Sequence, residues 1–205
     1  YLGFHSAHVY GVVRKFGECP ITRFIYESNS EEEKARHKKI FEEDLRLKGF
    51  LTLVSYDVWL YGNAFVSVYE PIKRELVCEH CGTKEDVGAA NYKFNLSKLQ
   101  FTHDCKQCKR KAVVSKVEDH KLKDSTKITL IRWDPKLIDI EHNRVTGESV
   151  YYYQIPRDDV SKVRAGNKTY INHMPMEILR AMQERKTFRF ADGALYHLKM
   201  PGPAG

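Results

Sequence analysis

Four of the five cysteines stand in two Cys-x-x-Cys pairs, and these pairs constrain the fold more than any other feature of the sequence. The first pair is followed by Gly82, and the segment between the pairs is 23 residues long. Two turns of this kind place four thiolates around one metal ion in the closed tetrahedral geometry of a structural zinc site. We therefore predict a zinc site formed by Cys78, Cys81, Cys105 and Cys108.

Other readings of these cysteines stay open. Redox chemistry needs one reactive pair at a helix start, whereas this chain has two pairs in a polar segment. An iron–sulfur cluster is a further alternative, and His80 or His103 offers a replacement ligand. We expect both histidines to be solvated loop residues and the fifth cysteine, Cys19, to be a small buried apolar residue. Because the segment has few large apolar side chains, zinc would supply its folding energy.

The charge balance bears on partners. Lysine and arginine number 34 against 27 acidic residues, which gives a net charge of +7 and suits a polyanion such as nucleic acid. No apolar stretch reaches the length of a membrane span, and no signal peptide is recognisable. The cysteine pattern favours a reducing compartment. Nucleic-acid contact is expected at the basic second pair, through Lys106, Lys109, Arg110 and Lys111.

Catalytic motifs are missing from the sequence. The glycines form no phosphate-binding loop, and no His-Glu-x-x-His pair occurs. A site with four protein ligands also leaves no open position on the metal. We therefore expect no catalytic residues, and we expect the chain to be one piece of a longer protein.

Periodicity and turn residues predict an α+β fold of helices and short antiparallel strands. Residues 1–77 and 124–205 form one domain, and residues 78–123 form an inserted zinc ribbon with four cysteine ligands. Gly62 is expected to end a helix with positive φ, and Asn63 to brace that turn. The expected helices span 31–48, with Gly49 ending or interrupting them, then 50–61, 156–165 and 175–185; the expected strands span 10–13, 21–26, 65–69, 128–133, 137–141 and 150–155, with a last hairpin over 188–198.

One segment resembles a known family. Asp57–Tyr69 contains Tyr-Gly-Asn-Ala-Phe between a predicted helix and a predicted strand, and in this it resembles the bacteriophage portal proteins. Three later segments follow in the family's order: 131–141 with its Asp-Pro and Ile-Glu, Tyr151–Tyr153 after a Gly turn, and 195–205 with its Leu-Tyr-His-Leu. Most portal proteins lack a zinc ribbon, so the resemblance does not say what the ribbon contacts.

The resemblance implies a non-enzymatic function. Portal proteins form a dodecameric homo-oligomeric ring through which double-stranded DNA is packaged and ejected, and they dock terminase, capsid or scaffold, and tail adaptor proteins. The chain would be part of the wing outside the channel, located in the virion and in the host cytoplasm during assembly. The alternative is a zinc-ribbon nucleic-acid-binding module of a larger DNA- or RNA-handling protein. A metal-dependent hydrolase is a third reading, and the closed metal site argues against it.

Overall fold

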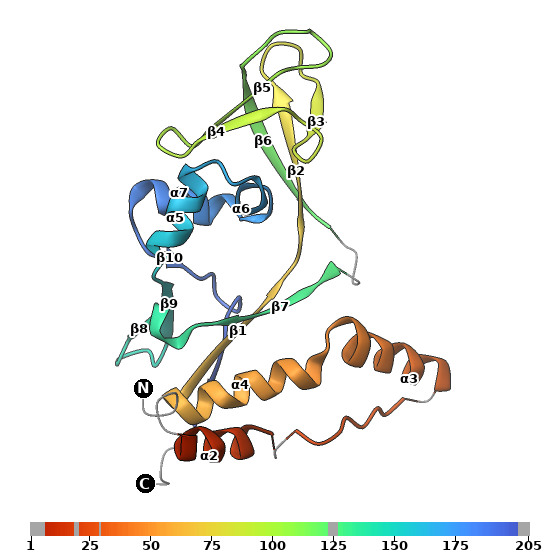
Figure 1. Cartoon of the computed structure of the whole chain (residues 1–205), viewed down its shortest axis with the longest axis vertical. Helices are drawn as coiled ribbons and strands as arrows, with labels where there is room; N and C mark the ends of the chain where they lie inside the picture. Colours follow the sequence, from red (N-terminus) through yellow and green to blue (C-terminus); the bar gives the residue numbers. More distant parts are fainter. Residues whose placement is uncertain (1–6, 19–20, 29, 123–126, 201–205) are drawn as a thin grey trace. The chain divides into compact units, whose positions relative to one another are not determined.

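The computed structural model describes residues 7–18, 21–28, 30–122 and 127–200. These residues form helices and antiparallel strands, which confirms the α+β class (Figure 1). The chain divides into two compact units. Unit 1 comprises residues 1–69, 124–138 and 191–205, and unit 2 comprises residues 70–123 and 139–190.

Unit 1 combines helices with a three-stranded sheet of order β11-β1-β7. Val54 of α4 and Phe65 of β1 are buried, and Phe16 of α2 packs on Trp59 of α4 with ring centroids 4.8 Å apart. The elements are α2 (Ala7–Glu18), α3 (Glu31–Lys38), a π-helix (Lys39–Asp44), α4 (Leu47–Tyr61), β1 (Asn63–Tyr69), β7 (Thr129–Trp133), a 3-10 turn (Pro135–Leu137) and β11 (Tyr196–Lys199).

The junction between α4 and β1 has the predicted geometry. Gly62 caps α4 in the left-handed region, with a φ of 73°, and its N–H donates to the carbonyl of Val58 at 2.9 Å. Asn63 braces the turn, since its side-chain amide donates to the carbonyl of Tyr61 at 3.3 Å. Its Oδ1 atom lies 2.8 Å from Nε2 of His197 on the neighbouring strand β11. The helix stop is thus tied directly to the sheet.

We expect alanine to have opposite effects at two glycines of this helix. Gly62→Ala should lower the free energy of unfolding by about 1–2 kcal/mol, because a Cβ atom disfavours positive φ, although nothing lies within 4 Å of that Cβ. Gly49→Ala should raise it by up to about 1 kcal/mol, since an exposed helical glycine loses backbone entropy on folding. Urea unfolding of both variants measures the difference. Equal effects of the same sign would show that the Gly62 conformation is not required.

Unit 2 contains a five-stranded antiparallel sheet of order β3-β2-β6-β5-β4, which carries both cysteine pairs. Alternation along β2 buries Arg74, Leu76 and Cys78 on one face. The remaining elements are a small sheet of order β10-β9-β8 and three helices. All the elements of unit 2, in chain order, are β2 (Ile72–Cys78), β3 (Lys84–Asp86), β4 (Tyr92–Asn95), β5 (Gln100–His103), β6 (Val113–Lys121), β8 (Ile138–His142), β9 (Ser149–Tyr153), α5 (Arg157–Arg164), α6 (Lys168–His173), α7 (Met176–Glu184) and β10 (Phe188–Arg189).

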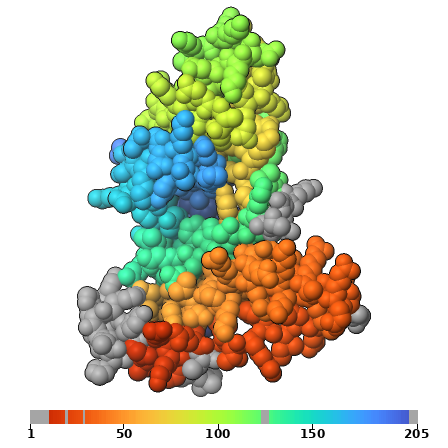
Figure 2. Space-filling model, turned by 45° about the vertical axis from the view of Figure 1, so that its right-hand side comes forward, coloured from red at the N-terminus to blue at the C-terminus, as the bar shows by residue number. Residues whose placement is uncertain are grey.

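The cysteine-bearing sheet shares its core with the three helices. Leu76 and Phe101 of the sheet are fully buried in one cluster with Val163, Ile171 and Leu179 of α5, α6 and α7. Figure 2 shows the sheet, in yellow and green, lying directly against these helices, in blue. The division into units therefore differs from the expected one, in which residues 78–123 form a separate insert. The expected polar loop between the pairs is replaced by β3, β4 and β5, and Tyr92 of β4 and Phe101 of β5 pack into the buried cluster.

Several expectations about individual helices and strands are also wrong. Residues 10–13 lie in α2 and not in a strand, and residues 21–26 form neither helix nor strand. The break after the first helix falls at Arg46, with a φ of 47°, and Gly49 is helical. The expected last hairpin does not form, because β10 pairs with β9 and β11 pairs with β1. Cys19 lies outside the described residues.

Candidate metal centre

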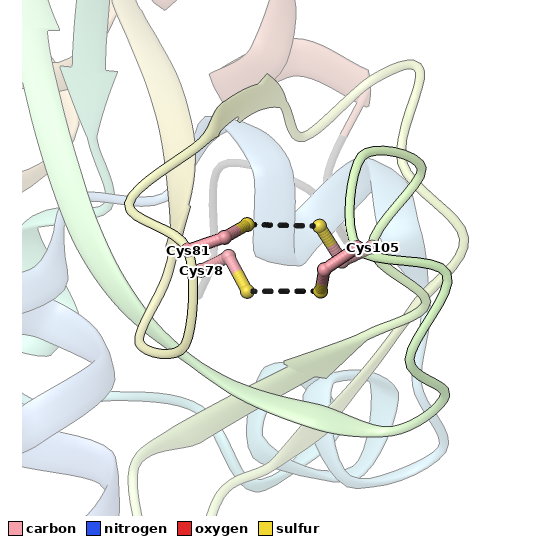
Figure 3. A group of neighbouring side chains, drawn as sticks. Cys78, Cys81 and Cys105 are labelled. Carbon is pink, nitrogen blue, oxygen red and sulfur yellow. Dashed lines mark hydrogen bonds between the residues drawn. The ribbon is translucent and has the colours of Figure 1, made fainter.

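The four predicted ligands come together at one end of the unit 2 sheet. Their sulfur atoms all lie within 4.8 Å of one another. The Sγ–Sγ distance is 3.6 Å from Cys81 to Cys105 and 4.0 Å from Cys78 to Cys108 (Figure 3). All four are free thiols, since a disulfide needs about 2.0 Å. The predicted convergence is confirmed, and the cluster is compatible with one metal site.

Two turns of the same geometry present these cysteines. In the first, the N–H of Cys78 donates to the carbonyl of Thr83 at 2.9 Å, and Gly82 has a φ of 71°. In the second, the N–H of Cys105 donates to the carbonyl five residues later at 3.0 Å, and Lys109 has a φ of 57°. Glycine adopts this conformation without strain, whereas a side chain at the equivalent position costs about 1 kcal/mol. The backbone strain at Lys109 shows how strongly the second turn is held.

The thiols of the cluster differ in their pKa values. Hydrogen bonds from the side chain and backbone of Thr83 lower the pKa of Cys81 to about 6, which makes the metal-binding thiolate accessible at neutral pH. The backbone of Cys108 lowers the pKa of Cys105, but burial and the neighbouring thiols outweigh it and raise that pKa to about 11. Four thiolates this close repel one another, so a metal ion is needed to hold all four ionised.

A buried polar pair adjoins the cysteines, and sequence reasoning missed it. His103 is 1% exposed, and its Nδ1 lies 2.6 Å from Oγ of Ser115. Its Nε2 lies 4.0 Å from Glu85, whose Oε1 accepts the backbone N–H of Lys106 at 2.8 Å. The expectation of a solvated His103 is therefore wrong, because alternation along β5 places it on the buried face beside Phe101. His80, in contrast, is exposed as expected.

Arg74 is the largest fully buried side chain of the described residues, and nothing in the sequence marks it. Its guanidinium donates to both carboxylate oxygens of Asp119 on β6, at 2.7 and 2.6 Å. It also donates to the carbonyls of Ile171 at 2.5 Å and Met174 at 3.0 Å, at the end of α6. This side chain thus joins the cysteine-bearing sheet to the helical layer through charged hydrogen bonds. Only its position two residues before Leu76 on an alternating strand hints at burial.

The candidate nucleic-acid contacts lie on the second cysteine turn. Lys106 is partly neutralised, since its Nζ lies 3.7 Å from Glu85 and donates to the carbonyl of Ala89 at 3.2 Å. Among the described residues, the side chains of Lys109 and Lys111 form no hydrogen bond or ion pair, and neither does that of Arg110. Three adjacent exposed cations therefore remain available at this turn.

Unit 1 holds a buried carboxylate that gives a pH prediction. Asp57 is 5% exposed, and Arg132 approaches its Oδ2 only to 3.5 Å. Burial raises the pKa of Asp57 from 3.8 to about 6; Arg132 lowers it, and Asp134 raises it further. Because the folded state holds this proton more tightly than the unfolded state, the free energy of unfolding should fall as pH rises from about 4 to 6.

The Asp57→Asn variant tests this assignment. The variant cannot ionise, so its free energy of unfolding should rise relative to the native protein between pH 4 and 7, by up to about 3 kcal/mol. Urea unfolding at several pH values gives the difference, and other titrating groups cancel in it. A difference that stays constant with pH would show that Asp57 is ionised at both ends of this range.

Among the described residues, none of the helices combines the length and apolar character needed to cross a membrane. No family model matches the chain, and no curated protein or solved structure matches it either. The portal resemblance stays a prediction, and the observations that bear on function are the cysteine cluster, the basic turn and the junction at Gly62.

Proposed function

We propose that the protein is a structural subunit of a ring that resembles a phage portal, with one zinc ion stabilising unit 2. The junction of α4, Gly62 and β1 carries this proposal. Its Tyr-Gly-Asn-Ala-Phe sequence is the main point of resemblance, and two of these residues have a structural role at the junction: Gly62 supplies positive φ, and Asn63 bonds to Tyr61 and His197. In this proposal the chain belongs to the wing, acts in the virion, and has no catalytic role.

Zinc is the metal that we propose for the cysteine cluster. Zinc–sulfur bonds of about 2.3 Å in a tetrahedron separate the sulfurs by about 3.8 Å. The distances of 3.6 and 4.0 Å lie on either side of this value. Four cysteines fill the coordination shell, so the ion has no position for water or substrate. This supports a structural metal and speaks against the hydrolase reading.

Imaging of the protein at its full natural length tests the ring. Negative-stain micrographs should show closed rings, and light scattering should give a mass of many subunits. The zinc should remain bound at one ion per chain, because the proposal places it inside unit 2. Monomers at every concentration tested would contradict the ring without affecting the metal assignment.

The second candidate is a zinc-ribbon module that binds nucleic acid, and the free cations of the second turn favour it. Under the ring proposal, DNA binding by the chain should be weak, independent of sequence and steeply salt-dependent, with a log–log slope of about −0.9 per neutralised phosphate. Lys109→Ala/Arg110→Ala/Lys111→Ala should weaken it modestly. A salt titration of a labelled duplex measures both proteins. Binding that selects sequence, survives physiological salt and disappears in the triple variant would favour the module.

A further inference from the structure

A large pocket of unit 2 is lined by three arginines that no other described residue neutralises. It has a volume of about 740 Å³ and lies between α5 and the C-terminal end of α7. Arg157 and Arg164 come from α5, and Arg185 comes from the end of α7. Among the described residues, these three guanidinium groups form no hydrogen bond or ion pair. No carboxylate belongs to the described lining, and the remaining cation, Lys186, pairs with Glu184 at 2.8 Å.

The pocket follows from the helical repeat of α5. Arg157, Val160, Ser161 and Arg164 fall at positions i, i+3, i+4 and i+7, which share one face of a helix. Ala181, Met182 and Arg185 line the opposite wall from α7. The α5 wall thus has an arginine at each end with Val160 and Ser161 between them, and the α7 wall has one arginine at its C-terminal end. Polar and charged residues therefore line this pocket together with a smaller apolar set, and its volume falls within the usual range of small-ligand sites.

We propose that this pocket binds a nucleoside di- or triphosphate. Guanidinium groups match phosphate oxygens in a two-pronged geometry, and three of them from two helices require more than one anionic group. Arg164 follows Arg157 by seven positions, which is about 10.5 Å along the helix axis. A single phosphate would require both side chains to bend inward over this distance, whereas a phosphate chain with its sugar spans it. The apolar residues Ile155, Val160 and Met182 offer a surface for the base.

This inference is independent of the ring proposal, and calorimetric titration of the full chain tests it. ATP should bind, adenosine should not, and inorganic tripolyphosphate should bind more weakly than ATP, because it lacks the base. Equal affinities for tripolyphosphate and ATP would overturn the nucleoside assignment. Binding of duplex DNA at this pocket without binding of ATP would overturn the small-ligand site.

Two variants of equal charge locate the binding. Arg157→Gln/Arg164→Gln/Arg185→Gln should weaken ATP binding tenfold or more, since each charged hydrogen bond is worth about that factor. Lys109→Gln/Arg110→Gln/Lys111→Gln removes the same charge from the exposed cysteine turn and should change the affinity less than about twofold. An equal loss of ATP affinity in both variants would show that only the overall charge of the protein matters, and it would overturn the proposal. Because Arg164 is exposed at the end of α5, Arg164→Gln alone keeps the test valid should the triple variant misfold.

Discussion

Replacing Cys78 and Cys105 together by serine is expected to abolish metal binding and to unfold unit 2. Each substitution removes one ligand from a different turn, so neither turn keeps its pair. A structural zinc site of this kind contributes on the order of 10 kcal/mol to folding, which is as large as the whole stability of a typical domain. Elemental analysis should find one zinc per native chain and none in the variant.

The extent of this unfolding depends on the shared core. Leu76 and Phe101 pack with Val163, Ile171 and Leu179, so α5, α6 and α7 should lose protection together with the sheet. Unit 1 has its own buried residues and should persist. Hydrogen exchange followed by mass spectrometry resolves these segments. Loss of protection confined to residues 78–123 would support a separate insert and contradict the shared core.

His80→Ala is the matched control for the metal ligands. His80 lies between the cysteines of the first pair and is exposed, so the variant should keep both its zinc and its hydrogen-exchange protection. A variant without zinc would show that the histidine belongs to the coordination shell. Finding iron in the native protein would instead replace the zinc assignment.

Arg74→Met is expected to destabilise unit 2 by about 3–5 kcal/mol, the usual cost of removing one partner from a buried ion pair. Methionine fills much of the volume, but Asp119 is left with an uncompensated charge, and the carbonyls of Ile171 and Met174 lose their donors. Urea unfolding gives the change in free energy. Arg74→Lys should also destabilise the unit, because an ammonium group cannot reproduce the two-pronged contact with Asp119.

A surface ion pair of the same sheet provides the control for Arg74. Lys121 lies 2.7 Å from Glu70, and both side chains are exposed. Lys121→Met should therefore change the stability very little, since water screens such pairs. If Arg74→Met were as mild as Lys121→Met, Arg74 would not be the link between sheet and helices that its hydrogen bonds indicate.

Several parts of the fold were predictable from local sequence. The two cysteine pairs predict their own convergence, since thiolates at this spacing have few other stable uses. Gly62 predicts the end of α4, because only glycine takes positive φ without strain. The strands at 65–69 and 128–133 and the helix after Pro175 also follow from alternation and from helix-start signals. In each case the physical cause lies within a few residues.

Other features were decided only by contacts between distant segments. Residues 10–13 have the composition of a strand, but they are helical in α2, where Phe16 packs on Trp59 of α4. The chain around 188–198 has the composition of a hairpin, but its two strands join different sheets because Tyr153 and Ala64 are their partners. Strand pairing depends on which edges are free elsewhere in the fold, and a local pattern does not contain this information.

The sequence by itself determined the convergence of the four cysteines, the helix stop at Gly62 and the α+β class, because each depends on residue type and short-range spacing. Only the tertiary structure decided that Arg74 and His103 are buried, that the cysteine-bearing sheet shares its core with α5, α6 and α7, and that Arg157, Arg164 and Arg185 surround one pocket. The physical reason is that burial and charge pairing belong to surfaces that meet across up to 100 residues of chain, as the bond from Arg74 to Met174 does.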